Sequence, residues 1–187
     1  MSTRIRFDWY ALLAVVIYAS LNVPAEVGGI TSITIQTKPA GLQFSVDSKA
    51  TQTAPQTLNL TQGTHTVMVA TPQAWASGTQ YVFTGWSDDG AASHTITVGT
   101  SSATYTASFK TQNQLIISAL PPAGGTVTPA NGGFYDAGTV VPIRATANSG
   151  YSFTGWSGSV NSASSPLTTV TISSPQTVIA LFFKASH

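Results

Sequence analysis

The segment Tyr-Val-Phe-Thr-Gly-Trp-Ser at residues 81–87 returns at residues 151–157 as Tyr-Ser-Phe-Thr-Gly-Trp-Ser, with one change. A repeated phrase with three aromatic residues indicates two copies of one structural unit. An aromatic residue at the same place in both copies is most simply a core anchor, because large aromatic side chains bury much apolar area. We therefore expect a repeat core at Phe83, Trp86, Phe153 and Trp156.

The repeat extends well before this phrase. Residues 63–71 align with residues 138–146, and residues 33–41 align with residues 116–124. What recurs is aromatic, small or β-branched rather than acidic, basic or nucleophilic. The repeat therefore indicates an architecture and lowers the expectation of catalysis.

The first copy carries two insertions, because the offset between equivalent residues falls from 83 to 75 to 70 along the chain. One insertion lies within residues 42–60 and is expected to form an extra hairpin. The other spans roughly residues 73–78 and contains Trp75, a residue particular to the first copy. Because aromatic residues are enriched at interfaces, Trp75 with nearby Tyr81 is the candidate contact to a sugar, lipid or protein.

Both copies show the pattern of β-strands with one buried face. Polar and apolar residues alternate at 32–36, 66–69, 94–98 and 168–172. Clusters of Gly, Pro, Asn and Ser interrupt these segments at short intervals, as turns do. The sequence predicts a mainly β protein with two tandem small antiparallel domains, sandwich-like or β-grasp-like, at residues 31–112 and 113–187.

Residues 1–30 form a separate N-terminal unit. Arg4 and Arg6 precede an almost uninterrupted apolar stretch, and a Val-x-Ala pattern ends at Ala25. These features fit a signal peptide cut after Ala25 or a retained membrane helix over residues 7–23. We expect retention, with a hydrophobic helix that anchors the chain through Trp9, Tyr10, Leu12, Leu13, Val15, Val16 and Ile17. Both alternatives place the β domains outside the cytoplasm, facing the periplasm or the cell exterior.

Composition excludes several classes of partner and site. The 187 residues include only 7 Lys and Arg and 6 Asp and Glu. Beyond residue 25 the two signs balance, which argues against nucleic acid as a partner, since that needs a basic surface. The chain has no cysteine, so disulfides and thiolate metal sites are excluded.

Catalytic and metal sites find little support among the polar residues. The segment Asp88-Asp89-Gly90 is interpreted as a turn, because Ca²⁺ takes about six to eight oxygen ligands and no further carboxylate lies close. The three histidines share no zinc-ligand spacing. A nucleophile elbow of the form Gly-x-Ser-x-Gly is missing, and carboxylate pairs for glycoside hydrolysis are scarce. We expect no enzyme activity, no cofactor and no metal.

Motifs in both copies are similar to those of bacterial surface modules. The second copy has Pro-Ala-Gly-Gly-Thr-Val at 122–127, the repeated phrase within 147–157, and a closing apolar strand at 178–182. On these motifs it resembles a divergent internalin-type B-repeat. The first copy, at 39–47, 54–60 and 63–67, resembles a PEGA-type domain, with Asp47-Ser48 where that family has Asp-Gly, and it ends like a B-repeat. The resemblance implies a β-rich extracytoplasmic module without shared catalytic residues.

Two classes of function are consistent with these features. The first is a non-catalytic structural and interaction protein, an accessory subunit whose β domains cover a protein partner in or at a membrane. The second is a secreted or surface adhesive module that binds a glycan or polymer through exposed aromatics such as Trp75. Because edge strands carry few charges, self-association through those edges into fibres is a further alternative.

Overall fold

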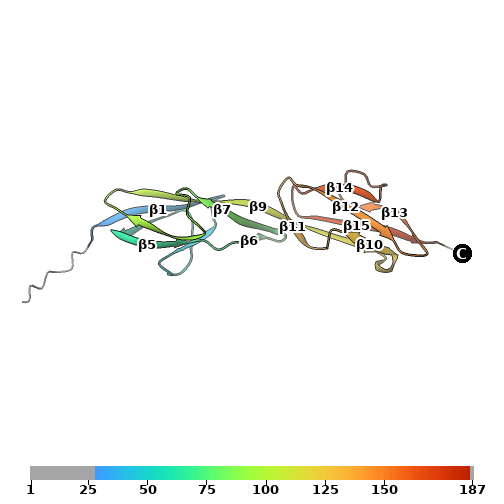
Figure 1. Cartoon of the computed structure of the whole chain (residues 1–187), viewed down its shortest axis with the longest axis horizontal. Helices are drawn as coiled ribbons and strands as arrows, with labels where there is room; N and C mark the ends of the chain where they lie inside the picture. Colours follow the sequence, from blue (N-terminus) through green and yellow to red (C-terminus); the bar gives the residue numbers. More distant parts are fainter. Residues whose placement is uncertain (1–27, 186–187) are drawn as a thin grey trace, which may run out of the picture.

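The computed structural model describes residues 28–185, which are built almost entirely of β-strands (Figure 1). Strands make up 63% of this part of the chain, and its one helical element is a 3₁₀ turn at Pro122–Gly124. The predicted mainly β fold is confirmed. The expected N-terminal helix and its anchor residues lie outside the described residues. Within residues 28–185, no helix has the length and apolar character needed to cross a bilayer.

The first copy places two sheets face to face. One sheet has the order β4-β1-β9-β7-β6, and the other has the order β3-β2-β5-β8. Their bounds are β1 (Ile30–Lys38), β2 (Gln43–Val46), β3 (Gln52–Thr53), β4 (Gln56–Thr61), β5 (Gly63–Met68), β6 (Gln73–Ala76), β7 (Thr79–Trp86), β8 (Ser93–Val98) and β9 (Ala103–Leu120). The core lies between the sheets, since its buried side chains come from both, including Ile35 of β1, Phe44 of β2 and Ile96 of β8.

The second copy repeats this arrangement with fewer strands. One sheet has the order β11-β9-β15-β13, and the other has the order β10-β12-β14. The bounds are β10 (Gly125–Thr128), β11 (Gly133–Asp136), β12 (Val140–Ala147), β13 (Tyr151–Ser157), β14 (Leu167–Thr171) and β15 (Gln176–Lys184). Ile117, Ile143 and Val178 belong to a second core cluster, distinct from the first. Equivalent strands therefore build equivalent sheets in the two copies.

Strand β9 belongs to both copies. Its first half closes the first copy beside β1, and its second half opens the second copy beside β15. At about 3.3 Å per residue, its 18 residues span roughly 60 Å. The expected boundary between residues 112 and 113 falls inside this strand, and the division into two domains stays a prediction.

The strand pairing is mostly antiparallel, as predicted, with two exceptions. β1 and β9 run parallel, and so do β9 and β15. In each copy the parallel neighbours are the first and the last strand, so a whole copy of chain forms the crossover between them. Alternation of polar and apolar residues marks a strand but not its direction, which explains why these pairs were not foreseen.

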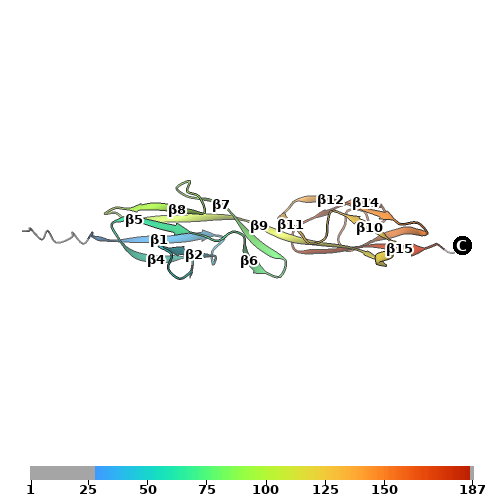
Figure 2. The ribbon, with the colours of Figure 1, turned by 60° about the horizontal axis from the view of Figure 1, so that its bottom comes forward.

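The two copies lie end to end in a rod. β1 begins near one end, and β15 finishes at the opposite end next to the C-terminus (Figures 1 and 2). Both insertions of the first copy form hairpins: β3 pairs with β2, and β6 pairs with β7. In the second copy, residues 148–150 alone connect the strands β12 and β13 that correspond to β5 and β7.

Candidate interaction site

Trp75 lies on the inserted strand β6 with 56% of its surface exposed. Its ring meets that of Tyr81 edge to face, with the centroids 5.5 Å apart and an interplanar angle of 70°. The other side of the indole lies over Gly41, where an added Cβ would come within 3.2 Å of Trp75 Cη2. Gly41 also has a φ of +91°, a conformation that glycine adopts without strain. Tyr81 and Gly41 together hold the exposed indole in one orientation.

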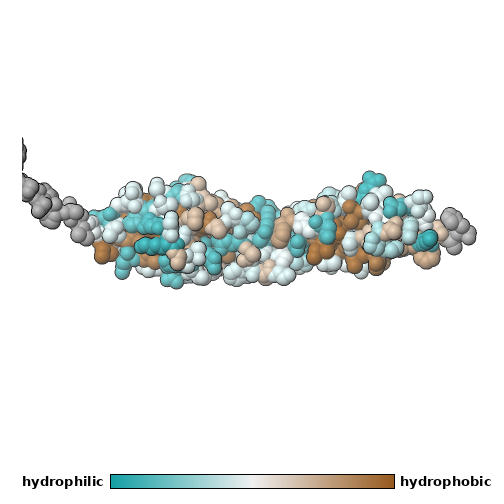
Figure 3. All heavy atoms as spheres, turned by 90° about the horizontal axis from the view of Figure 1, so that it is seen from below, coloured by the Kyte–Doolittle hydropathy of each residue, from teal (hydrophilic) through white to brown (hydrophobic). Residues whose placement is uncertain are grey.

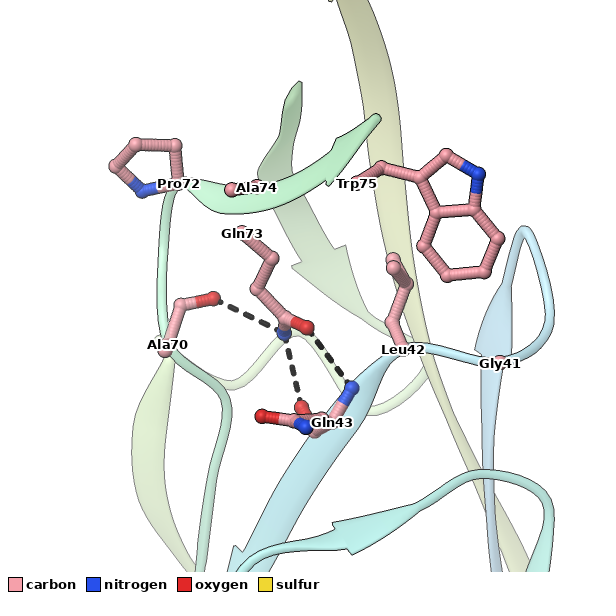
Figure 4. Close-up of a pocket in the computed structure, with 8 residues that line it drawn as sticks. All are labelled: Gly41, Leu42, Gln43, Ala70, Pro72, Gln73, Ala74 and Trp75. Carbon is pink, nitrogen blue, oxygen red and sulfur yellow. Dashed lines mark hydrogen bonds between the residues drawn. The ribbon is translucent and has the colours of Figure 1, made fainter. Parts of the chain in front are cut away.

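A shallow groove of about 300 Å³ lies beside the indole (Figure 4). It is lined by Gly41, Leu42, Gln43, Ala70, Pro72, Gln73, Ala74 and Trp75. These residues come from the turn before β2 and its first residue, from the segment that leads into β6, and from β6 itself. The indole nitrogen of Trp75 points away from the groove in Figure 4, so the ring presents its hydrocarbon side to the opening.

The side chain of Gln73 fixes the floor of this groove. Its Nε2 donates to the carbonyl oxygens of Gln43 at 2.9 Å and Ala70 at 3.2 Å. Its Oε1 accepts the backbone N–H of Gln43 at 2.8 Å. The side-chain amide of Gln73 therefore pairs with the backbone of Gln43 as a neighbouring strand would. Both N–H groups of the amide have partners within the protein. A ligand in the groove would therefore meet the ring of Trp75 beside a fixed surface of mixed polar and apolar character.

The structure brings both predicted contact residues together, with Trp75 exposed and Tyr81 half-buried beneath it. Their role in binding stays a prediction. The four residues of the expected repeat core lie at equivalent places. Trp86 and Trp156 are buried, while Phe83 and Phe153 are half-buried and pack against them with centroid distances of 6.4 and 5.7 Å.

Other exposed apolar residues are distributed over both copies. In Figure 3 apolar patches alternate with hydrophilic residues, and the broadest lie over the second copy. Exposed large apolar side chains there include Val140 on β12, Leu167 on β14 and Phe183 on β15. Trp75 combines exposure of an aromatic side chain with a position beside a groove.

The structure contains a histidine–carboxylate pair that the sequence did not reveal. His65 Nδ1 lies 2.7 Å from Asp47 Oδ2, and its Nε2 lies 2.8 Å from the carbonyl oxygen of Thr61. The hydrogen bond between the two side chains, which the Asp47 carboxylate accepts, raises the pKa of His65 and lowers the pKa of Asp47. His94 makes a similar pair, with Nε2 3.0 Å from Asp88 Oδ2 and Nδ1 2.9 Å from the carbonyl oxygen of Ala91. Both histidines tie turns to strands.

The His65 pair lacks the geometry of a hydrolase triad. Thr61 Oγ1 lies 3.5 Å from His65 Nε2, so Thr61, His65 and Asp47 follow one another in the order of a hydrolase triad. However, Nε2 faces the Thr61 carbonyl, an acceptor only, so it bears the proton that a general base would need to take up. No group of three or more potential metal ligands occurs within residues 28–185.

Comparison with known proteins finds a family match in the second copy. Residues 116–186 match the family model of a divergent InlB B-repeat domain. This is less than half of the chain, and it covers the second copy from within β9 onward. The resemblance predicted for the second copy is confirmed, while the PEGA-like character of the first copy stays a prediction. The matched family is a repeat domain and not an enzyme family. No curated protein matches the chain.

Proposed function

We propose that the chain is a non-catalytic structural and interaction module that works outside the cytoplasm, with the Trp75 groove as its partner contact. The B-repeat match supports a surface or structural role. The main support is Trp75 itself, a half-exposed indole held by Tyr81 and Gly41 on an insertion that only the first copy carries. The finer role is that of an accessory subunit, held at a membrane by its N-terminal segment and docked on a protein partner.

The size of the contact follows from the exposed area of the indole. A tryptophan side chain can bury about 150–250 Å². With 56% of it exposed, a partner could cover roughly 100 Å² more. At about 25 cal/mol per Å², this contributes about 2–3 kcal/mol, the order of a binding hot spot. Because the ring is already fixed, little side-chain entropy is lost on binding.

The first experiment isolates the tagged protein from its native membranes and measures its intact mass and the size of its complex. A mass that begins at Met1 or Ser2, in a large complex, supports the anchored subunit. The variant Trp75→Ala is expected to be found free of the complex. The control Phe183→Ala changes an aromatic side chain that is 66% exposed in the second copy, and this variant is expected to be found in the complex. A mass that begins at Glu26 together with a free monomer would refute the anchored role.

A second candidate function is adhesion to a glycan, which the exposed indole beside a groove also favours. Trp86 and Trp156 are buried, so within residues 28–185 a ligand-induced change in tryptophan fluorescence reports on Trp75. Saturable binding of a surface polysaccharide that is lost in Trp75→Ala would support this alternative.

Self-association through edges is a separate expectation. β4, β8, β13 and β14 lie at sheet edges and contain no Asp, Glu, Lys or Arg. Unpaired edges without charges can pair with another chain. A single monomeric species in sedimentation at high protein concentration would exclude self-association.

A further inference from the structure

The strands through which the chain enters and leaves each copy are parallel neighbours. In the first copy β1 and β9 are aligned over six residue pairs, from Ile33 with Ala103 to Lys38 with Ser108. In the second copy β9 and β15 are also aligned over six pairs, from Leu115 with Gln176 to Leu120 with Leu181. The same relation between first and last strand therefore holds twice.

This arrangement fixes how the protein would respond to a pull along its axis. β1 begins at one end of the rod and β15 finishes at the other (Figures 1 and 2). A pull at the two ends draws β1 and β9 in opposite directions along their common edge, and it does the same to β9 and β15. The hydrogen bonds between them are loaded together, in shear. Neighbouring strands pulled apart from one end would instead lose these bonds one after another.

Each loaded terminal strand is also held along its second edge. β4 pairs with β1 over six positions, and β13 pairs with β15 over six positions. Sliding β1 out of the sheet must therefore break two ladders at once. It must also draw Ile33 and Ile35, which are 1% and 0% exposed, through a packed core.

The junction between the copies offers no loop that could yield first. β9 crosses it as one strand, and at Gln112 and Asn113 it pairs with β7 on one edge and β11 on the other. Asn113 is buried and accepts a hydrogen bond from Thr79 Oγ1 at 3.1 Å. Gln112 accepts one from Gln80 at 2.9 Å and donates one to Asp136 at 2.8 Å. Load thus passes between the copies through a covalent strand braced on both sides.

We propose that this chain is a load-bearing element that resists tension between its two ends. The inference deepens the structural role proposed above, and it rests on that role. Mechanical strength is a property of the folded chain alone, so it is measured without a partner. Failure of the Trp75 contact and failure of the load-bearing role are therefore separate results.

Single-molecule stretching of the full chain tests the inference by comparing two directions of pull. The first attaches handles at the chain ends. The second uses Ile30→Cys and Ser101→Cys, two exposed sites that lie at the same end of the neighbouring strands β1 and β9. The protein has no cysteine of its own, so the attachment is unique. We expect the first copy to break at a severalfold higher force in the end-to-end direction. Equal forces in the two directions would overturn the proposal.

An engineered disulfide identifies the strands that bear the load. Gln36 and Thr106 are register partners on the neighbouring strands β1 and β9. Neighbouring strands lie about 4.8 Å apart, so Gln36→Cys with Thr106→Cys falls within the Cα separation that a disulfide spans. Oxidation is expected to remove the unfolding step of the first copy, because roughly 240 Å of chain between the cysteines can no longer extend. The matched control joins Thr64→Cys to Thr97→Cys on β5 and β8, outside the loaded pairs. It should shorten the extension but leave the breaking force unchanged. Loss of the unfolding step in the control, or a rise in its breaking force, would contradict the assigned load path.

Discussion

Replacing each repeat tryptophan by phenylalanine is expected to have unequal effects in the two copies, although Trp86 and Trp156 are equivalent in sequence. Trp156 Nε1 donates to the carbonyl oxygen of Ser165 at 2.9 Å. Trp86 Nε1 is buried and has no hydrogen-bond partner among residues 28–185. The cause lies in the following connection, which has nine residues after β13 and six after β7. The longer one folds back over Trp156, and Ala163 also accepts its backbone N–H at 2.8 Å.

The magnitudes follow from packing and hydrogen bonding. In either copy, phenylalanine leaves a space of roughly 40 Å³, which costs about 1 kcal/mol at about 24 cal/mol per Å³. Trp156→Phe also loses a hydrogen bond with a net value of about 1 kcal/mol, so its total cost is about 2 kcal/mol. Trp86→Phe instead removes a buried unpaired donor, which relieves about 1–3 kcal/mol. We therefore expect Trp86→Phe to lie between neutral and a stabilisation of about 2 kcal/mol, so the two variants should differ by about 2–4 kcal/mol.

The assay is denaturant unfolding followed by far-ultraviolet circular dichroism, with hydrogen exchange to assign each loss of stability to a copy. Trp75→Phe serves as the control, since surface substitutions usually change stability by less than about 0.5 kcal/mol. Equal destabilisation by the two core variants, or a larger loss for Trp86→Phe, would refute the reasoning. Either result would mean that the N–H of Trp86 finds a partner, such as an internal water, in solution.

Two further predictions concern the loops of the first copy. Because the pKa of His65 is raised, its pairing with Asp47 stabilises the fold below pH 6.5, and this stabilisation is lost as pH rises through the pKa of the folded state. Because the pKa of Asp47 is lowered, the stabilisation is also lost at the acid end, as pH falls below about 3.8. The free energy of unfolding should therefore decline above pH 6.5. The decline should be at most about 1 kcal/mol, because solvent screens the Asp47 side chain, which is 33% exposed. In thermal melts across about pH 5–8.5, His65→Gln should remove this decline. Gly41→Ala should cost about 1 kcal/mol and displace the Trp75 ring, seen as increased acrylamide quenching. The control is Gly99→Ala, where an added Cβ meets open space and φ lies outside the left-handed region, so stability and quenching should not change. If acrylamide quenching of Trp75 is unchanged in Gly41→Ala, Gly41 does not hold the indole in place.

The sequence was sufficient to predict the class of fold and the place of the inserted aromatic. Alternation in β1 places Ile33 and Ile35 inward, and the structure buries both. Side-chain contacts between residues far apart in the sequence could not be predicted, because they depend on the register of the strands. Asp47 and His65 meet only because the turn after β2 lies beside β5. A single sequence contains no signal for that contact.

The continuous strand β9 had a signal that was easy to misjudge. Residues 111–114 read Thr-Gln-Asn-Gln, a polar stretch between two apolar strands, which resembles a linker. It contains no Gly or Pro, so nothing forces the chain to turn there. The amides of Gln112 and Asn113 are used by flanking strands from both copies. Their polarity reflects the junction of two sheets and not a flexible connection.

The same insertion supplies Trp75 and braces the junction between the copies. Tyr81 and Tyr151 are equivalent, so Thr79 and Gln80 correspond to a turn in the second copy, yet in the first they extend β7 onto Asn113 and Gln112. The turn of the inserted hairpin also touches the second copy, where a Cβ at Gly78 would lie 2.9 Å from Cβ of Pro175. Gln114 N–H donates to the Gly78 carbonyl oxygen at 2.8 Å. An exposed contact residue is thereby placed on the element that stiffens the rod. A partner held at Trp75 would therefore act on the junction directly, and not on a loose surface loop.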